Sequence, residues 1–333
     1  MPRLSRLKGA ECLKLLSVVL PSYNEELNIQ RTIDRLSTVL QEASIPYELI
    51  FVNDGSRDET WTMIQKAWQE RDDVIGIDFS RNFGKEAAIL AGLAHANGSC
   101  CAVIDCDLQH PPEKLVEMYR LWEQGYDLIE GVKRSRGKES FLHKLCAGGF
   151  YWIMSYVTHV DMSRASDFRL MDRKVVDALV SMPERGIFFR ALSSWVGFKS
   201  TTIEFDVQER EIGESKWSFT SLIKYAIRNI VSFSGMPLKM IAYFGFAGLL
   251  FTIVLGIQTL VRYWSGNAVE GFTTVILLIL LTSSMIMISL GIIGLYLARM
   301  YEEIKQRPRY IIHHHLKGKK ESCETNVGLD EQA

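Results

Sequence analysis

The sequence predicts an α/β protein in which helices flank a mostly parallel sheet, followed by an amphipathic helix and two membrane-spanning helices. In the first two-thirds of the chain, short apolar runs alternate with stretches of helical periodicity. This pattern is typical of parallel sheets with right-handed crossovers. In the last third, residues 240–261 and 272–298 carry no charged side chain. Each of these two runs is long enough to cross about 30 Å of hydrocarbon.

The composition narrows the class of protein. With 333 residues, the chain is long enough for more than one domain. Its formal net charge of -1 gives no indication of a nucleic-acid-binding surface. The six cysteines show no C-x-x-C spacing, which is typical of free thiols in a reducing compartment. The N-terminus has basic residues but no apolar core, so we expect no cleaved secretory signal.

Strands and helices are expected to alternate along the first part of the chain. Apolar runs predict strands at 15–20, 47–52, 74–79, 100–104 and 126–132, with helices at 26–42, after Asp58 and at 86–96. Asp58 suits a helix N-cap, and the Pro111-Pro112 pair suits the first turn of a further helix. Residues 141–157 predict an apolar helix, and 167–173 and 203–210 carry further strand-like pieces.

Polar side chains gather where the predicted strands end. These clusters are Tyr23 to Glu25, Asp54, Asn82 to Lys85, and Asp105 to Gln109. In open α/β sheets, ligands bind outside the carboxyl ends of the strands, so one binding site is expected there. No G-x-G-x-x-G follows the first strand, which disfavours an ordinary dinucleotide-binding domain.

Asp105 and Asp107 are the strongest candidates for metal ligands. They lie two residues apart directly after a short apolar run. Hard cations such as Mg²⁺ or Mn²⁺ prefer carboxylate oxygens and share their other positions with substrate phosphates. A lone D-x-D is more often a solvated acidic loop. Here the other strand-end clusters favour the metal site.

The C-terminal third indicates a membrane protein. Residues 219–231 have apolar side chains at helical spacing, with Lys224 and Arg228 off the apolar face. Such a helix beside a membrane span lies in the headgroup layer, although a core helix of the soluble domain is an alternative. The predicted domains are a cytoplasmic domain at 1–214, a loop and interfacial helix at 215–237, two membrane helices at 238–299, and a cytoplasmic basic tail at 300–333.

Basic residues follow the second membrane run, at Arg299, Lys305, Arg307 and Arg309. The positive-inside rule therefore predicts that both termini are cytoplasmic and that the 263–271 loop lies outside. Residues 321–333 are expected to be disordered. The triplet at His313 to His315 could bind a metal, but with no partner ligands evident in the sequence a surface tract is the expected interpretation.

Five motifs together resemble the family-2 glycosyltransferases. They are Pro21-x-Tyr-Asn-Glu25, Asn53-Asp-Gly-Ser56, Asp105-x-Asp-x-Gln-His-Pro-Pro112, Asp167-Phe-Arg169 and Gly213-Glu-Ser-Lys216. More closely, the chain resembles the polyprenyl-phosphate hexose transferases, which include dolichyl-phosphate mannose synthases and bacterial undecaprenyl-phosphate glucosyltransferases. The resemblance covers roughly residues 15–310. Asn53 departs from it, because an Asp is usual at that position.

This resemblance implies a GT-A fold, inversion at the anomeric carbon and a set of residue roles. A catalytic carboxylate is implied at Asp167, although orienting Arg169 or capping a turn are alternatives for that side chain. The implied nucleotide-sugar contacts are Pro21, Tyr23, Glu25, Asp54, Asp105, Asp107, Lys133 and Arg134. The implied metal ligands are Asp105, Asp107 and Gln109, and the implied phosphate-gripping residues are Arg210 and Lys216.

The expected function is transfer of a hexose from a nucleotide sugar to a polyprenyl phosphate in a bacterial inner membrane. UDP-glucose and undecaprenyl phosphate are the expected substrates, with UDP-GlcNAc and then GDP-mannose as alternative donors. A homo-oligomer is compatible with the sequence. A processive polysaccharide synthase and an inactive membrane adaptor are the competing hypotheses. The chain lacks the Q-x-x-R-W motif of the first, and a scaffold would not need Asp105, Asp107, Arg210 and Lys216.

Overall fold

The structure is a computed structural model that describes residues 14–134, 165–182, 189–206, 235–265 and 271–318. The chain forms two compact units. The first combines residues 1–216 with 308–333, and the second is residues 217–307. The predicted helices at 141–157 and 219–231 and the predicted disordered segment 321–333 lie outside the described residues.

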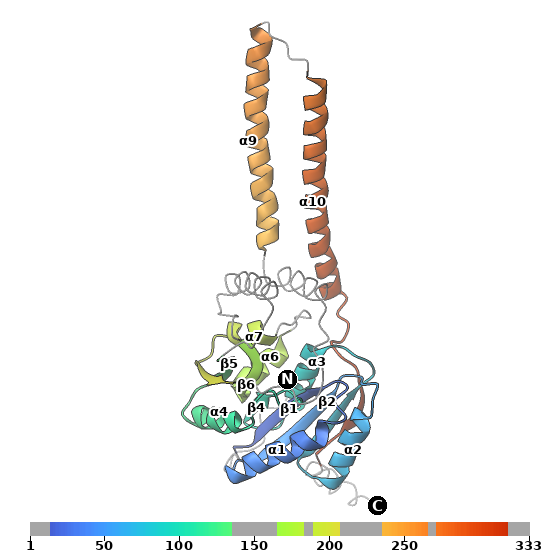
Figure 1. Cartoon of the computed structure of the whole chain (residues 1–333), viewed down its shortest axis with the longest axis vertical. Coiled ribbons are helices and arrows are strands. Elements are labelled where there is room, and N and C mark those ends of the chain that lie inside the picture. The colour runs from blue at the N-terminus through green and yellow to red at the C-terminus, as the bar shows by residue number, and fades with distance from the viewer. Residues whose placement is uncertain (1–13, 135–164, 183–188, 207–234, 266–270, 319–333) are drawn as a thin grey trace, which may run out of the picture. The chain divides into compact units, whose positions relative to one another are not determined.

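The first unit is built around one mixed sheet (Figure 1). In the described residues its strands are β1 (Leu16–Ser22), β2 (Tyr47–Asn53), β3 (Val74–Phe79), β4 (Cys100–Val103), β5 (Leu128–Lys133), β6 (Ala165–Asp172), β7 (Ser200–Phe205) and β8 (Ile312–Leu316), in the order β7-β5-β6-β4-β1-β2-β3-β8. β6 and β8 run antiparallel to their neighbours, and the other neighbouring pairs are parallel. The sheet is therefore mostly parallel, as predicted.

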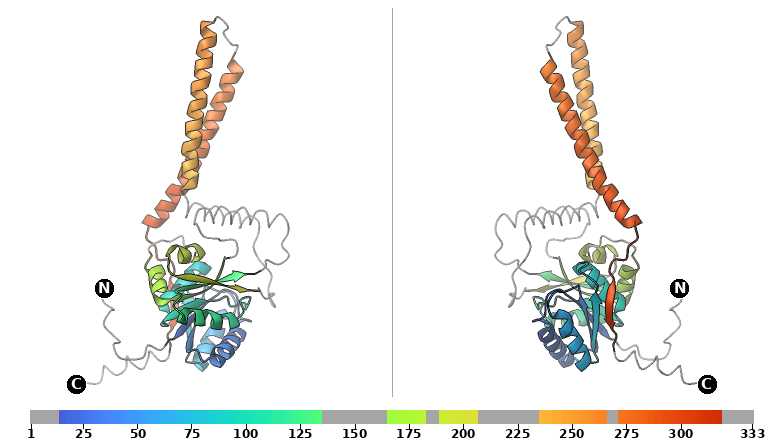
Figure 2. Two further views of the ribbon diagram at one scale, coloured as in Figure 1. Left: turned by 90° about the vertical axis from the view of Figure 1, so that its left-hand side faces the viewer. Right: turned by 90° about the vertical axis from the view of Figure 1, so that its right-hand side faces the viewer.

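Helices cover both faces of the sheet (Figure 2). They are α1 (Ile29–Glu42), α2 (Thr60–Glu70), α3 (Lys85–His95), α4 (Glu113–Glu123), α6 (Arg173–Ser181) and α7 (Phe189–Trp195). Val18 of β1 belongs to the core cluster that also contains residues of α1, α2 and α4. Val19 faces α3, which packs so closely that a Cβ on Gly92 would lie 2.2 Å from the Val19 side chain. Because both faces of β1 are buried, its sequence is a mostly apolar run rather than an alternation of apolar and polar residues.

Several predicted elements have different boundaries or caps in the structure. α1 begins at Ile29, three residues after its predicted start, and β7 spans Ser200–Phe205 rather than 203–210. α2 begins at Thr60 with Glu59 in the N-cap position, one residue later than the cap expected at Asp58. The carboxylate of Asp58 still accepts a hydrogen bond from the Thr60 backbone N–H at 3.1 Å, so it satisfies a donor of the first turn. β5 begins at Leu128, two residues after the predicted start of that strand.

β8 is one of three described elements that the sequence analysis missed, together with α6 and α7. It pairs antiparallel with β3, although the two strands lie more than two hundred residues apart in the chain. Within the segment predicted as a basic tail at 300–333, residues 300–304 end a helix and residues 312–316 form an edge strand of the sheet. The three histidines of β8 give it no alternation of apolar and polar residues, so the local sequence offered little indication of a strand.

The second unit contains α9 (Met236–Trp264) and α10 (Phe272–Ile304). Within them, Pro237–Thr259 and Leu278–Ile304 have mean hydropathies of 2.2 and 2.3, and both are long enough to cross a membrane. Their large apolar side chains, such as Phe244 and Leu290, are exposed in the protein alone. This combination of length, hydropathy and exposed apolar surface matches the predicted pair of membrane helices.

Candidate active site

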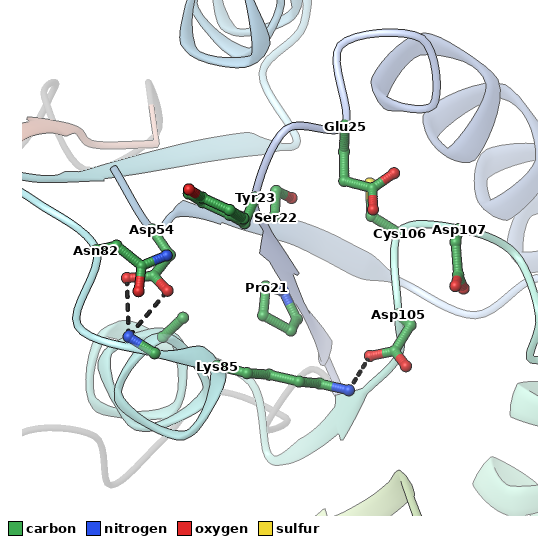
Figure 3. Close-up of a pocket in the computed structure, with 12 residues that line it drawn as sticks. Pro21, Ser22, Tyr23, Glu25, Asp54, Asn82, Lys85, Asp105, Cys106 and Asp107 are labelled. Carbon is green, nitrogen blue, oxygen red and sulfur yellow. Dashed lines mark hydrogen bonds and ion pairs between the residues drawn. The ribbon is translucent and has the colours of Figure 1, made fainter. Parts of the chain in front are cut away.

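A pocket of about 340 Å³ opens at the carboxyl ends of β1, β2 and β4 (Figure 3). Its lining residues are Pro21, Ser22, Tyr23, Glu25, Asp54, Asn82, Gly84, Lys85, Ala88, Asp105, Cys106 and Asp107. All of them except Pro21, Ser22 and Ala88 come from the four strand-end clusters that the sequence singled out. They meet because β4, β1, β2 and β3 are parallel neighbours, so the loops that follow them leave the sheet at one edge.

Asp54 is positioned by a tight turn after β2. Gly55 has φ +64°, and a Cβ there would lie 2.4 Å from the Arg81 backbone, so the turn requires a glycine. The Asp54 carboxylate accepts hydrogen bonds from the backbone N–H groups of Phe83 (2.6 Å) and Gly84 (2.9 Å). Burial raises the pKa of Asp54, partly offset by these two hydrogen bonds. The carboxylate thus ties the β2 and β3 loops together at the pocket.

Asp105 and Asp107 follow β4 in a turn that contains Leu108 at φ +57°. Both aspartates line the pocket. Gln109 does not line it, and its backbone N–H donates a hydrogen bond to the Asp107 carboxylate at 3.1 Å. The turn therefore directs two carboxylates into the pocket.

Asp167 reaches the same place from an antiparallel strand. β4 and β6 pair as far as Val103 opposite Arg169, and the chain continues from there to Asp105 on one side and Asp167 on the other. Lys85, at the start of α3, joins the two carboxylates. Its ammonium lies 2.6 Å from an Asp105 oxygen and 2.8 Å from an Asp167 oxygen.

Asp167 has a second cationic partner. The Arg190 guanidinium donates to both of its oxygens, at 2.7 and 3.1 Å. The Asp167 side chain is only 9% exposed. Glu86 lies in the same group of charges and accepts a hydrogen bond from the Phe189 backbone N–H at 2.8 Å. Two cations thus hold Asp167 beside the pocket.

The network shifts the pKa values of its members in opposite directions. Burial alone would raise the pKa values of Asp105 and Asp167, but nearby cations, chiefly Lys85, outweigh burial and lower both. Burial alone would lower the pKa of Lys85, but the two aspartates raise it. For Glu86, burial and the charge of Asp167 raise the pKa to about 7. Asp105, Asp167 and Lys85 are therefore charged at neutral pH.

Arg169 is fully buried, and its ion-pair partner is not Asp167. Its guanidinium lies 3.2 Å from the Glu130 carboxylate and donates a hydrogen bond to the Arg190 backbone oxygen at 3.1 Å. Asp167 therefore does not orient Arg169 by direct contact, and that alternative is wrong. Asp167 instead holds Lys85 and Arg190.

The remaining predicted residues have different positions. Lys133 ends β5, opposite Phe205 of β7. Arg134 follows it, forms long, exposed ion pairs with Glu204 (3.6 Å) and Asp206 (3.8 Å), and does not line the pocket. Arg210 and Lys216 lie outside the described residues.

Sequence reasoning assigned no role to three charged residues of this network: Lys85, Glu86 and Arg190. Lys85 is the last residue of a strand-end cluster and Glu86 follows it, so the sequence predicted that both lie near the carboxyl ends of the strands but did not reveal their partners. Arg190 follows Phe189 at the start of α7, with no motif around it. Its contact with Asp167 depends on how α7 packs against β6, which only the tertiary structure decides.

The pocket residues fit a hard divalent cation. Asp105 and Asp107 supply carboxylate oxygens on one wall of the pocket, the donors that Mg²⁺ and Mn²⁺ prefer. The Lys85 ammonium, 2.6 Å from Asp105, shows that this wall already attracts a positive charge. These residues could therefore hold either ion.

Comparison with known proteins shows similarity to glycosyltransferases. Residues 17–180 match the family described as glycosyl transferase family 2. The chain is 40% identical to the uncharacterized glycosyltransferase YkcC of Bacillus subtilis over 301 residues, which are 89% of this chain and 92% of that protein. The chain belongs to glycosyl transferase family 2.

The chain is also similar to other glycosyltransferases over most of its length. The prophage bactoprenol glucosyl transferase homolog of Escherichia coli is 34% identical over 302 residues, covering 89% of this chain and 98% of that protein. Among solved structures, glucosyl-3-phosphoglycerate synthase from Mycobacterium tuberculosis has a TM-score of 0.47 at 18% identity, covering 66% of this chain and 77% of that one. Family membership and the mixed, mostly parallel sheet agree with the GT-A-type fold expected from the motifs.

Proposed function

We propose that this glycosyltransferase moves glucose from UDP-glucose to undecaprenyl phosphate, with inversion at the anomeric carbon. The observation that carries the proposal is one pocket with Asp54, Asp105 and Asp107 on its wall, in a chain that also has two helices long enough to cross a membrane. A nucleotide sugar suits the pocket and a lipid acceptor suits the helices. Relatives named bactoprenol glucosyl transferase, including that of Shigella phage SfII at 34% identity, support glucose and this kind of lipid carrier.

In the proposed donor complex, Pro21, Tyr23, Glu25 and Asp54 contact the nucleoside. Asp105 and Asp107 would hold Mg²⁺ or Mn²⁺ from the pocket wall, and Gln109 of the same turn would join them only if its side chain turned toward the pocket, which it does not line. The ion would supply positive charge to the donor diphosphate. Lys133 or Arg134, together with Arg210 and Lys216, grips the donor and acceptor phosphates. Fixed cations at these positions stabilise the developing charge without reorganisation during the reaction.

In the reaction, an acceptor phosphate oxygen attacks the anomeric carbon while the bond from that carbon to the UDP oxygen breaks. A phosphate monoester is largely ionised at neutral pH, so a strong general base is unnecessary. Asp167 is poorly suited to be one, because two cations lower its pKa. We therefore assign Asp167 the role of a positioning residue that holds Lys85 and Arg190 at the pocket.

The proposed location is the bacterial inner membrane, crossed twice, with the catalytic domain and both termini in the cytoplasm. The pairing of β3 with β8 supports an even number of crossings. These strands lie on either side of α9 and α10 in the chain and belong to one sheet, so both ends of the helix pair are on the same side.

The test is a transfer assay with UDP-glucose, undecaprenyl phosphate and Mg²⁺ or Mn²⁺, measuring both UDP release and the glycolipid product. Asp107→Asn should reduce turnover about 100-fold or more, because it removes a carboxylate charge from the metal wall. Asp34→Asn, a matched change on the exposed face of α1, should leave turnover unchanged. Full activity of Asp107→Asn, or of the wild type in excess EDTA, would contradict the metal assignment. A polymeric product would indicate a processive synthase, and no product from any UDP-sugar would indicate an inactive adaptor.

A further inference from the structure

The returning strand β8 holds a cluster of possible metal ligands on the edge strand of the sheet, and none of these ligands lines the pocket. β8 is fastened to β3 and its surroundings by backbone pairing and by two contacts at its ends. The Ser80 backbone N–H donates to the Ile311 oxygen at 3.0 Å, and the Trp68 indole N–H donates to the Lys317 oxygen at 2.8 Å. The path of this strand beside β3 is therefore well defined.

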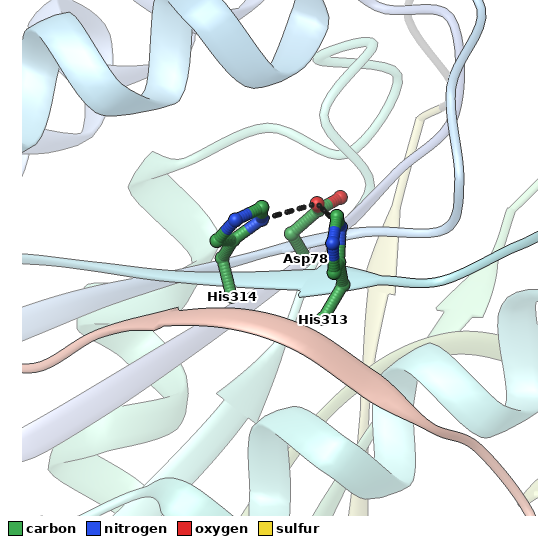
Figure 4. Close-up of side chains that lie close together, drawn as sticks. All are labelled: Asp78, His313 and His314. Carbon is green, nitrogen blue, oxygen red and sulfur yellow. Dashed lines mark hydrogen bonds and ion pairs between the residues drawn. The ribbon is translucent and has the colours of Figure 1, made fainter.

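An irregularity in the pairing brings two successive histidines to one aspartate. Asp78 pairs with His314 and Phe79 pairs with Ile312, so His313 is an extra residue on the β8 side. In a regular strand, neighbouring side chains point to opposite faces. A bulge re-aims one of them. Both imidazole rings consequently approach the Asp78 carboxylate (Figure 4).

The spacing of the three side chains matches a metal site. The Nδ1 atoms of His313 and His314 lie 3.5 and 3.2 Å from the same Asp78 oxygen. Ligand atoms around tetrahedral zinc, at about 2.0 to 2.2 Å from the ion, lie about 3.3 to 3.6 Å from one another. The His314 contact at 3.2 Å is also a hydrogen bond, whereas the His313 contact at 3.5 Å is longer than an ordinary one. All three ligand atoms lie within 4.8 Å of one another.

Neighbouring residues hold these ligands in place. The Asn53 side-chain amide donates to the other Asp78 oxygen at 2.7 Å, and Trp61 stacks on the His314 ring with centroids 6.0 Å apart. Such outer contacts orient metal ligands and are a regular part of metal sites. The Asp78 side chain is 10% exposed, whereas His313 and His314 are 62% and 52% exposed. An ion can therefore enter from solvent and meet a fixed carboxylate.

We propose that Asp78, His313 and His314 bind a zinc-type dication that fastens β8 to β3. Two imidazoles and one carboxylate suit zinc rather than magnesium, and a water can complete the tetrahedron. The site differs from the Asp105 and Asp107 wall in both donor type and position, and it does not depend on the proposed transferase function. It also changes the interpretation of the histidine triplet, because Asp78 supplies the partner ligand that the sequence did not reveal.

The test is isothermal titration of Zn²⁺ into the full chain in detergent, purified without a polyhistidine tag. Saturating Mg²⁺ is present throughout to occupy oxygen-donor sites. We expect one Zn²⁺ per chain, and about tenfold or more weaker binding in Asp78→Asn and in His314→Gln. Zn²⁺ should also raise the unfolding temperature of the wild type more than that of either variant, because an ion that binds only the folded form stabilises it.

His315→Gln is the matched control from the same tract. His315 is one residue further along β8, and its ring packs against His95 at 4.7 Å rather than against Asp78. Zn²⁺ binding should be unchanged in this variant. If Zn²⁺ affinity fell equally in His315→Gln and His314→Gln and did not change in Asp78→Asn, the ion would be bound by the exposed histidines alone, which would overturn the proposal. Absence of saturable Zn²⁺ binding would overturn it as well. Unfolding temperatures in EDTA identify any misfolded variant. If Asp78→Asn does not fold, His314→Gln still tests the proposal, because His314 is exposed and its substitution should not disturb the fold.

Discussion

At the residue scale, Asp167 of β6 forms ion pairs with Lys85 and Arg190 beside the pocket. Asp167→Asn removes the charge that holds Lys85 and Arg190. We expect turnover to fall about 100-fold or more, because misplaced charged groups lose most of their effect on the transition state. Turnover of this variant should be measured against pH. A positioning role predicts the same proportional loss across neutral pH, whereas a general-base role predicts a changed pH profile.

Asp127→Asn provides the control for this prediction. Asp127 also forms a close ion pair, with Lys174 at 2.6 Å, but it precedes β5 and does not line the pocket. The same chemical change there should leave turnover close to that of the wild type. Comparable losses in the two variants would mean that any broken ion pair in this unit impairs the enzyme.

Glu86 makes the stability of the folded protein depend on pH. Its pKa is raised from 4.5 to about 7, chiefly by burial and then by Asp167. Its contribution to the free energy of unfolding is therefore fully present below about pH 4.5 and is lost as the pH rises through 7. Relative to Glu86→Gln, the wild type should show a falling unfolding temperature between these pH values. Each kcal/mol corresponds to about 2 to 4 °C. Parallel pH curves for the two proteins would contradict the raised pKa.

At the scale of elements, β8 protects the edge of β3. Removing the chain from Pro308 onward would expose the unpaired backbone of β3 and abolish the stack of Tyr310 on Phe79, whose centroids lie 5.1 Å apart. Unpaired edge strands promote aggregation. We therefore expect a lower unfolding temperature and a shift to larger species in size-exclusion chromatography.

Truncation after Gly318 is the matched control. It keeps β8 and removes residues 319–333, where disorder is expected from the sequence. The unfolding temperature should match that of the full chain. If both truncations behave alike, β8 does not stabilise the sheet. A soluble version of the catalytic unit should accordingly rejoin residues 308–318 to the domain rather than end before α9.

At the scale of the whole molecule, the two apolar helices and the returning strand predict one topology. β3 and β8 must lie on the same side of the membrane to pair, and the basic residues after α10 favour the cytoplasm. A fluorescent protein fused after residue 333 should therefore fluoresce, and alkaline phosphatase fused there should be inactive. Phosphatase inserted in the 266–270 loop should be active. The reverse pattern would contradict the proposed orientation.

The sequence by itself determined the features that depend on local pattern. Apolar runs bounded by polar clusters were enough to predict β1 to β5 and the helix pair, because buried strands and membrane helices each require a particular length of apolar side chains. The strand-end rule then placed Asp54, Asp105 and Asp107 together at one edge of the sheet. All three line the observed pocket.

Only the tertiary structure decided which distant residues meet. Lys85, Asp167 and Arg190 converge because β6 runs antiparallel beside β4 and α7 packs on it, and no local pattern encodes such neighbours. The partnership of Asp78 with His313 and His314 likewise depends on a chain that leaves the sheet, forms two long helices and returns with a bulge. Local periodicity reports which face of an element is buried. The neighbour that covers this face is chosen by packing over the whole chain.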